Sequence, residues 1–287
     1  MAPTIPTVPN KDGEVNKYNL LNIAVNTPRL YYVNGIRNSA KDHALTASLL
    51  SILCEHPVYG VYNLSNGAIL DLGQCLLDYT QNASARVFGN RKLVPGKKLR
   101  EDEVKKIVEE TVKGSVVWNQ ATVTLFREVA NNYGQNTIII AHSQGNLITS
   151  NALFIIERTL GSAALKFVRV YSLASPSPAW PLGLRYTNGG GGRQENAFMN
   201  DLVALLRPHN LAAKMGVTRF QNAGDFRTHT GSGAVGLTPH GVNENIALNF
   251  LRSIRSNLGK SKEFPPDFIE KSSKKAEDAM KLIGVNQ

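Results

Sequence analysis

The segment from Asn136 to Asn151 constrains the fold of this chain most strongly, because its hydrophobic pattern changes within a few residues. It begins with Ile138, Ile139 and Ile140, a β-branched run typical of a strand buried on both faces. Apolar residues at helical spacing follow, at Leu147, Ile148, Ala152, Leu153, Ile155 and Ile156. We therefore predict a strand that turns sharply into a helix, with Ser143 at the turn.

A turn this sharp strains the backbone of the serine and crowds the positions two before and two after it, which therefore need very small side chains. Ala141 and Gly145 occupy these positions, and His142 and Gln144 complete the turn. The predicted geometry presents the hydroxyl of Ser143 at the edge of a sheet. It also places the amide of Gln144 at a helix N-terminus, where it can bind an oxyanion. Ser143 is thus the candidate nucleophile.

Strand and helix patterns alternate along the chain. Strand patterns cover 29–33, 58–62, 138–140, 167–173, 184–187 and 217–221, and helical patterns cover about 43–53, 68–79, 104–112, 123–133, 147–156, 200–206 and 242–251. This alternation predicts an α/β fold, with a mostly parallel central sheet and helices on both faces. We expect one domain over 28–257, preceded by an extended arm over 1–27. A basic tail over 258–287 would form an amphipathic helix at best.

Charge and composition limit which binding partners and which cellular location we expect. The 287-residue chain has a formal net charge of +10, and such a surface attracts phosphate groups. We expect an anionic membrane surface as a partner of the basic patches and no specific nucleic acid, with the oligomeric state left open. The basic cluster with the fewest acidic residues interspersed consists of Arg91, Lys92, Lys97, Lys98 and Arg100. No signal peptide or bilayer-length apolar run is visible, so a cytoplasmic protein, or one exported without a cleavable signal, is expected.

The two cysteines, Cys54 and Cys75, each lie in an apolar helical pattern. This context favours reduced thiols in the core, and a single bridge between them is the alternative.

A serine hydroxyl becomes nucleophilic when a histidine removes its proton and a carboxylate orients that histidine. The base should come from the loop between the last strand and the closing helix, where His240 fits best and His229 is the alternative. The acid should lie between serine and base. Asp201 fits this position, and Asp225 is the alternative. Three further histidines are set aside by their sequence context: His43, His56 and His142.

A second oxyanion donor is expected from the loop after an early strand. The segment Val33-Asn34-Gly35-Ile36 ends such a strand. Gly35 allows the backbone to approach closely, and the amide of Ile36 is the expected donor.

The A-H-S-Q-G turn after a buried strand, the early V-N-G-I loop, and then Asp201 and His240 in this order resemble the α/β-hydrolase superfamily, and within it the lipase and esterase branch. The resemblance covers about residues 29–257. It departs from the family pattern in two places, with Ala141 for the first glycine of G-x-S-x-G and N-G where lipases more often have H-G. It implies ester hydrolysis through an acyl-serine intermediate, without metal or organic cofactor.

The substrate class is argued from the candidate lid segments 81–99 and 175–192, the apolar Trp180, Pro181 and Leu182, and the basic surface. These favour an acyl-lipid or phospholipid ester, although the same apolar residues would also serve to close the core. Two other readings stay open. One is a thioesterase, amidase or acyltransferase on the same fold, and the other is a non-catalytic hydrolase-like binding protein that uses its basic surface.

Overall fold

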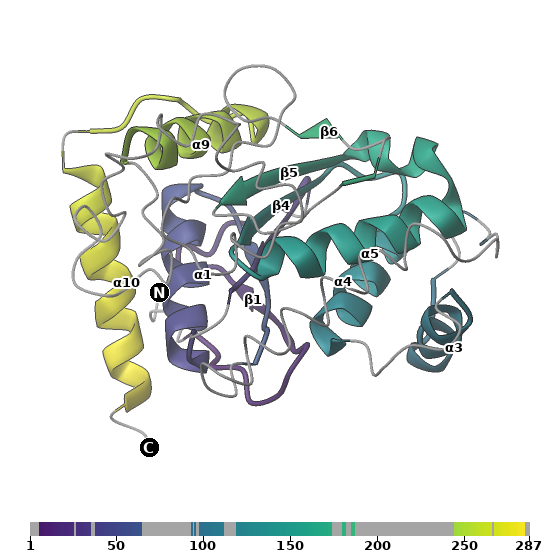
Figure 1. Ribbon diagram of the computed structural model, residues 1–287. Helices are drawn as coiled ribbons and strands as arrows, with labels where there is room; N and C mark the ends of the chain where they lie inside the picture. Colours follow the sequence, from purple (N-terminus) through teal and green to yellow (C-terminus); the bar gives the residue numbers. More distant parts are fainter. Residues whose placement is uncertain are drawn as a thin grey trace, which may run out of the picture.

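A mixed sheet lies at the centre of the protein (Figure 1). The computed structural model describes residues 6–25, 27–35, 38–64, 93, 95, 98–111, 119–173, 180–181, 185–186, 244–265 and 267–284. Within these residues the sheet has six strands in the order β1-β3-β2-β4-β5-β6. They are β1 (Val15–Tyr18), β2 (Arg29–Val33), β3 (Val58–Val61), β4 (Thr137–His142), β5 (Val168–Leu173) and β6 (Arg185–Tyr186). β1 runs antiparallel to β3, and the other neighbouring strands are parallel.

Helices cover both faces of the sheet. They are α1 (Ala40–Leu53), α3 (Glu101–Thr111), α4 (Gln120–Asn131), α5 (Gly145–Leu160), α9 (Glu244–Asn257) and α10 (Phe268–Gly284), with a 3-10 helix η1 (Ser162–Phe167) before β5. Ile139 and Ala141 of β4 pack in a core with α3, α4 and α5, whereas Ile138 and Ile140 pack in a second core with α1, α9 and α10. This alternation is what a strand buried on both faces requires. The predicted α/β class, with a mostly parallel sheet between two helical layers, is confirmed.

One helix on each face of the sheet, α1 and α4, begins at a side-chain cap. Ser39 and Asp42 form a capping box at α1, in which the Ser39 hydroxyl accepts from the Asp42 amide at 3.1 Å and the Asp42 carboxylate accepts from the Ser39 amide at 3.1 Å. At α4 the side chain of Asn119 accepts from the Ala121 amide at 2.8 Å. The residue before the α1 cap, Asn38, donates to the Gly35 carbonyl at 3.2 Å, and Asn119 donates to Asn63 Oδ1 at 3.0 Å. Both helices therefore start beside the carboxyl ends of β2 and β3.

The prediction of an extended N-terminal arm over residues 1–27 is wrong for residues 15–18. These residues form β1, which pairs with β3 from Val15 opposite Val61 to Tyr18 opposite Val58. Tyr18 is only 1% exposed, and its hydroxyl donates to the Thr7 carbonyl at 2.9 Å. A four-residue strand is too short to show a clear alternation in sequence, but pairing with β3 covers what would otherwise be an open sheet edge.

The prediction of a C-terminal tail outside the domain is also wrong. The amphipathic helix is present as α10, but it packs against α1, and Ala276 is fully buried in the shared core. Figure 1 shows α10 beside α1, at the opposite side of the molecule from α3. The apolar stripe of α10 therefore completes the domain, and its lysines lie on the other face of the helix.

Arg255 of α9 joins α1 to the segment that leads into α10. Its buried guanidinium pairs with Glu55 at 2.9 Å, donates to the Leu53 carbonyl at 2.7 Å, and lies 5.1 Å and 5.4 Å from the ring centroids of Phe264 and Phe268. A buried cation needs such partners to offset its lost hydration.

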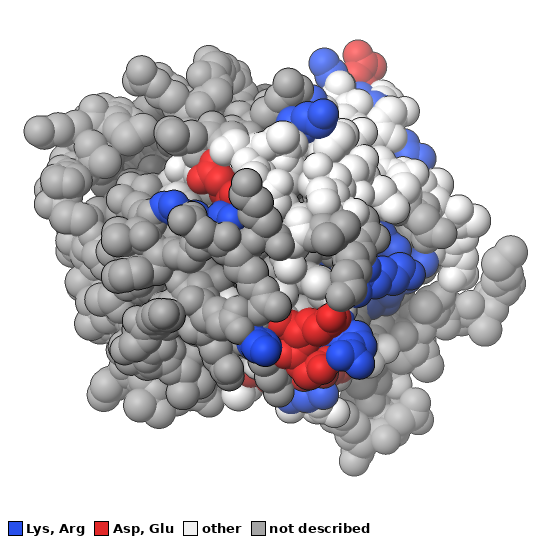
Figure 2. All heavy atoms as spheres, turned by 90° about the vertical axis from the view of Figure 1, so that its right-hand side faces the viewer, with Lys and Arg blue, Asp and Glu red and all other residues white. Residues whose placement is uncertain are grey.

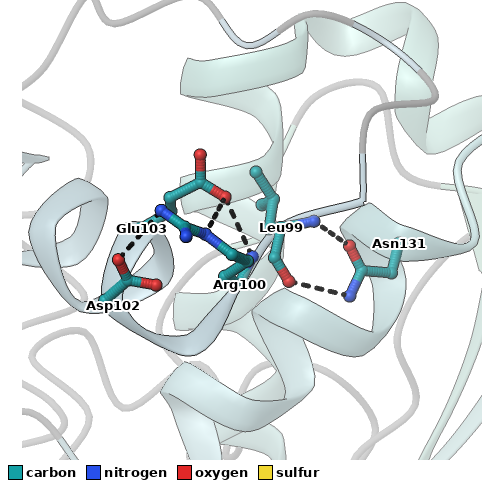
Figure 3. A network of polar contacts seen from close by, with 5 residues as sticks. All are labelled: Leu99, Arg100, Asp102, Glu103 and Asn131. Atoms are coloured by element: carbon teal, nitrogen blue, oxygen red, sulfur yellow. Dashed lines mark hydrogen bonds and ion pairs between the residues drawn. The ribbon is translucent and has the colours of Figure 1, made fainter.

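Basic and acidic side chains adjoin one another on the face seen from the side of α3 (Figure 2). Of the predicted basic cluster, Lys98 and Arg100 lie in the described residues. Arg100 pairs with Asp102 at 3.2 Å and Glu103 at 3.7 Å at the start of α3 (Figure 3). The charge of Arg100 is thus locally balanced, and binding of an anionic membrane by the whole cluster stays a prediction.

Several predicted elements lie outside the described residues. They are the helices at 68–79 and 200–206, the strand at 217–221, Cys75, and most of the candidate lids. Cys54 is a free, buried thiol, and burial raises its pKa to about 12. Trp180 is partly buried and packs against the core beneath α3, α4 and α5, which agrees with the core-closing role for this residue. Within the described part of the chain, the helices lack the length and apolar character needed to cross a bilayer.

Candidate active site

The junction of β4 and α5 has the sharp turn expected around Ser143. β4 is buried along its whole length between β2 and β5, and α5 begins at Gly145 with Gln144 as its N-cap residue. Ser143 has a φ of +51°, in the left-handed region that non-glycine residues rarely adopt. Its side chain is fully buried, and its Oγ has no hydrogen-bond partner among the described residues. The predicted strand, turn and helix are therefore confirmed.

The neighbouring strand requires a glycine at position 145 of the turn. A Cβ atom on Gly145 would lie 2.4 Å from the Val33 carbonyl oxygen and 3.0 Å from that of Asn34, both at the end of β2. Backbone atoms cannot easily move away from such a contact, so glycine is needed at position 145. Ala141 is fully buried in β4 between Val33 of β2 and Ser172 of β5. The crowding inferred from the sequence thus has an identifiable source at Gly145.

Gly35 lies directly against the serine, as predicted for the oxyanion loop. β2 and β4 are parallel neighbours, so their carboxyl ends meet at one edge of the sheet. A Cβ atom on Gly35 would lie 2.6 Å from Ser143 Cβ and 3.2 Å from Ser143 Oγ. The structure therefore brings Gly35, Ser143 and Gln144 together. Ile36, the predicted donor, lies outside the described residues.

A buried network of carboxamide side chains, which was not predicted from the sequence, lies next to these residues. Asn34 Nδ2 donates to the carbonyls of Gly35 at 3.0 Å and Asn63 at 2.8 Å, and Asn34 Oδ1 accepts from the Asn63 amide at 2.8 Å. Asn63 Nδ2 donates to Gln144 Oε1 at 2.8 Å, and Asn63 Oδ1 accepts from Asn119 Nδ2 at 3.0 Å. One signal for Asn34 and Asn63 was available: each closely follows a predicted parallel strand.

His43 and His56 each make a structural contact away from the serine hydroxyl. His43 Nδ1 lies 2.8 Å from Asn34 Oδ1, and burial lowers the pKa of His43 to about 3. His56 Nε2 lies 2.7 Å from the Pro28 carbonyl, beside the amino end of β2 and thus at the opposite edge of the sheet from Ser143. Burial also lowers the pKa of His56. His142 is buried, and strand alternation directs it to the same face as Ile140, toward α1 and α9.

The remaining predicted site residues, Asp201, His240, His229 and Asp225, lie outside the described residues. Their assignment as acid, base and alternatives stays a prediction. Among the described residues, no group of three or more His, Cys, Asp or Glu side chains is placed to hold a metal ion. The described site therefore consists of a strained serine, a helix N-terminus, a glycine backbone and a carboxamide network.

No protein-family model matches this chain, and comparisons with curated proteins and with solved structures found no match either.

Proposed function

We propose that this protein is a serine hydrolase of the α/β-hydrolase type, which cleaves carboxylic esters through an acyl-serine intermediate on Ser143. One observation carries the proposal: the φ of +51° at a buried serine, where a central strand turns into a helix. Such strain costs on the order of 1 to 3 kcal/mol and is typically concentrated at functional sites. A turn with only a structural role would be easier to form with glycine.

In the proposed reaction Ser143 Oγ attacks the carbonyl carbon of the ester while a histidine takes the hydroxyl proton. His240 is assigned this role from its position in the sequence, and Asp201 is assigned to orient it, with His229 and Asp225 as alternatives. The tetrahedral intermediate then expels the alcohol, which receives the proton from the histidine. Water, deprotonated by the same histidine, hydrolyses the acyl-serine and restores the enzyme.

Two features support stabilisation of the oxyanion beside the serine. The amide of Gln144 lies at the N-terminus of α5, where the helix dipole favours negative charge. The backbone of Gly35 contacts Ser143 from the neighbouring strand end, so the loop after β2 is close enough to supply a second amide.

The proposed substrate is an acyl-lipid or phospholipid ester. Full burial of Ser143 supports a site covered from bulk solvent, which suits an apolar acyl chain. The basic composition of the chain supports attraction to anionic headgroups.

A fluorophosphonate probe, which phosphonylates activated serines, tests the proposed chemistry. We expect the folded protein to be labelled and Ser143→Ala, folded by circular dichroism, to show no labelling. Absence of labelling in folded wild-type protein would refute the enzyme proposal and favour a binding protein. His240→Ala compared with His229→Ala then identifies the base, and loss of labelling only in His229→Ala would overturn the choice of His240.

A substrate panel tests the ester class. We expect hydrolysis of dispersed phospholipids or long-chain acylglycerols, with Ser143→Ala as the inactive control. Turnover of short soluble esters together with none of the dispersed lipids would refute the lipid assignment while leaving the hydrolase proposal in place.

A further inference from the structure

The two residues that flank Ser143 in space, Gly35 and Gln144, are held by one buried network. Its members come from strand and helix ends that are far apart in the sequence. Their side chains are between 0% and 6% exposed: Asn34, His43, Asn63, Asn119 and Gln144. Buried carboxamides are costly unless each donor and acceptor is paired, so a network of this size at one sheet edge calls for an explanation.

Asn34 joins the ends of β2 and β3 beyond their last ladder pair, Val33 opposite Val61. Its side chain forms a reciprocal pair with the backbone of Asn63, accepting from the amide and donating to the carbonyl, both at 2.8 Å. The same Nδ2 group donates to the Gly35 carbonyl at 3.0 Å, which also accepts from Asn38 Nδ2 at 3.2 Å. The Gly35 carbonyl is therefore held by two side chains.

The direction of every bond in the network follows from the backbone groups at its ends. The Ala121 amide can only donate, so Asn119 Oδ1 accepts and Asn119 Nδ2 must donate to Asn63 Oδ1. Asn63 consequently donates through Nδ2 to Gln144 Oε1. By the same logic Asn34 Oδ1 accepts from the Asn63 amide, and His43 must carry its proton on Nδ1. The N-cap of α4 thus fixes the side-chain orientation of the residue that follows the serine.

We propose that Asn34 and Asn63 are positioning residues that hold Gly35 and Gln144 on either side of Ser143. The inference rests on the proposed function and adds to it the groups that keep the oxyanion site in place. Donors that are already oriented stabilise a developing oxyanion without a reorganisation cost, and an error of about 1 Å can cost roughly 100-fold in rate. Loss of either asparagine should therefore slow the reaction without weakening substrate binding.

The chain offers a matched control at Asn131, at the end of α4 opposite Asn119. Asn131 makes the same reciprocal pair with a backbone, accepting from the Leu99 amide at 2.6 Å and donating to its carbonyl at 3.4 Å (Figure 3). The length of α4 puts about 18 Å between the two ends of the helix. Asn131→Ala removes an equivalent pair of side-chain-to-backbone hydrogen bonds. It should lower the stability of the protein without changing the reactivity of Ser143.

The test measures the second-order rate constant of fluorophosphonate labelling, together with kcat and KM for p-nitrophenyl butyrate. We expect Asn34→Ala and Asn63→Ala to lower the labelling rate constant and kcat by about tenfold or more, with KM within about twofold. Asn131→Ala should stay within about twofold of wild type in all three. If the asparagine variants keep wild-type rates while wild type is labelled, the positioning proposal is wrong and the hydrolase proposal stands. Absence of labelling in the wild-type protein would refute both the hydrolase proposal and the positioning proposal.

A double-mutant cycle separates positioning from general loss of stability, and it serves even if Asn34→Ala does not fold. If Asn63 acts through the side chain of Gln144, the variants Asn63→Ala and Gln144→Ala remove the same interaction. The double variant should then lose about as much rate as either single variant, roughly tenfold. A loss near 100-fold, the product of the two single effects, would show that Asn63 does not act through Gln144 and would overturn the proposal.

Discussion

Acidification from pH 7 to pH 5 should destabilise the protein through His43. This ring is fully buried among Tyr18, Tyr32 and Tyr62, whose ring centroids lie 6.1, 5.3 and 5.3 Å away. Its Nδ1 proton is committed to Asn34, and burial lowers its pKa from 6.5 to about 3. Between these two values the unfolded chain binds a proton that the folded protein does not. The free energy of unfolding therefore falls as the pH decreases through this window.

The magnitude follows from the two pKa values. At pH 7 the folded ring is neutral and the unfolded ring is mostly neutral. At pH 5 the unfolded histidine is protonated, 1.5 pH units below its pKa of 6.5, whereas the folded one is still neutral at 2 units above about 3. At 1.36 kcal/mol per unit, the loss assigned to His43 between pH 7 and pH 5 is about 2 kcal/mol.

Urea denaturation followed by circular dichroism at pH 7 and pH 5 measures this loss. The matched variant is His43→Asn, whose amide can replace the Nδ1 donor to Asn34 but cannot titrate in this range. Its absolute stability should be lower at both pH values because the ring is lost. The loss of unfolding free energy on acidification should nevertheless be about 2 kcal/mol smaller in the variant than in wild type. An equal loss in both proteins would refute the burial and protonation state assigned to His43.

Three further predictions test the site and the packing by urea denaturation. Ser143→Gly should abolish fluorophosphonate labelling yet raise the free energy of unfolding by about 1 kcal/mol, because glycine relieves the strain at φ +51°; a less stable variant would contradict the strain. Gly145→Ala should cost roughly 3 kcal/mol through contact with the Val33 carbonyl. Gly259→Ala, with open space around the added Cβ and a φ of +71° at the end of α9, should cost only about 1 kcal/mol, and equal costs would contradict the crowding at Gly145. Arg255→Met should cost about 3 kcal/mol and speed amide exchange in α10, because the buried Leu53 carbonyl and the Ser261 carbonyl lose their donor. Unchanged exchange would contradict the role of Arg255 in linking α1 to α10.

Much of the fold was predictable because its signals are local. The β-branched run at 138–140 and the helical spacing behind Ser143 each fall within a few residues, and they correspond to β4 and α5. The same holds for β2, β3, β5, α1, α4 and α9. The predictions for the N-terminal arm and the C-terminal tail were wrong because the structure of each segment depends on contacts with elements that are distant in the sequence. β1 is a strand because β3 offers it an edge, and α10 joins the domain because α1 offers it an apolar surface.

In the candidate site, too, features that depend on neighbouring residues were predictable, and features that depend on distant residues were not. Ser143, Gln144, Ala141 and Gly145 lie next to one another in the chain, so their turn could be inferred from side-chain size and hydrophobic pattern alone. Gly35 could be proposed because it follows an early strand. Its contact with Ser143 depends on β2 lying beside β4 in the sheet.

The sequence by itself thus determined the strand, the strained serine and the helix, since each depends on residues that are close together in the sequence. The tertiary structure alone decided what surrounds the serine. Hydrogen bonds from Asn34 to Asn63 and from Asn63 to Gln144 join strand and helix ends that are remote in the chain, and such bonds leave no periodic pattern in a sequence. Only the folding of β2, β3 and β4 into adjacent parallel strands brings these side chains to one edge, where each finds its partner.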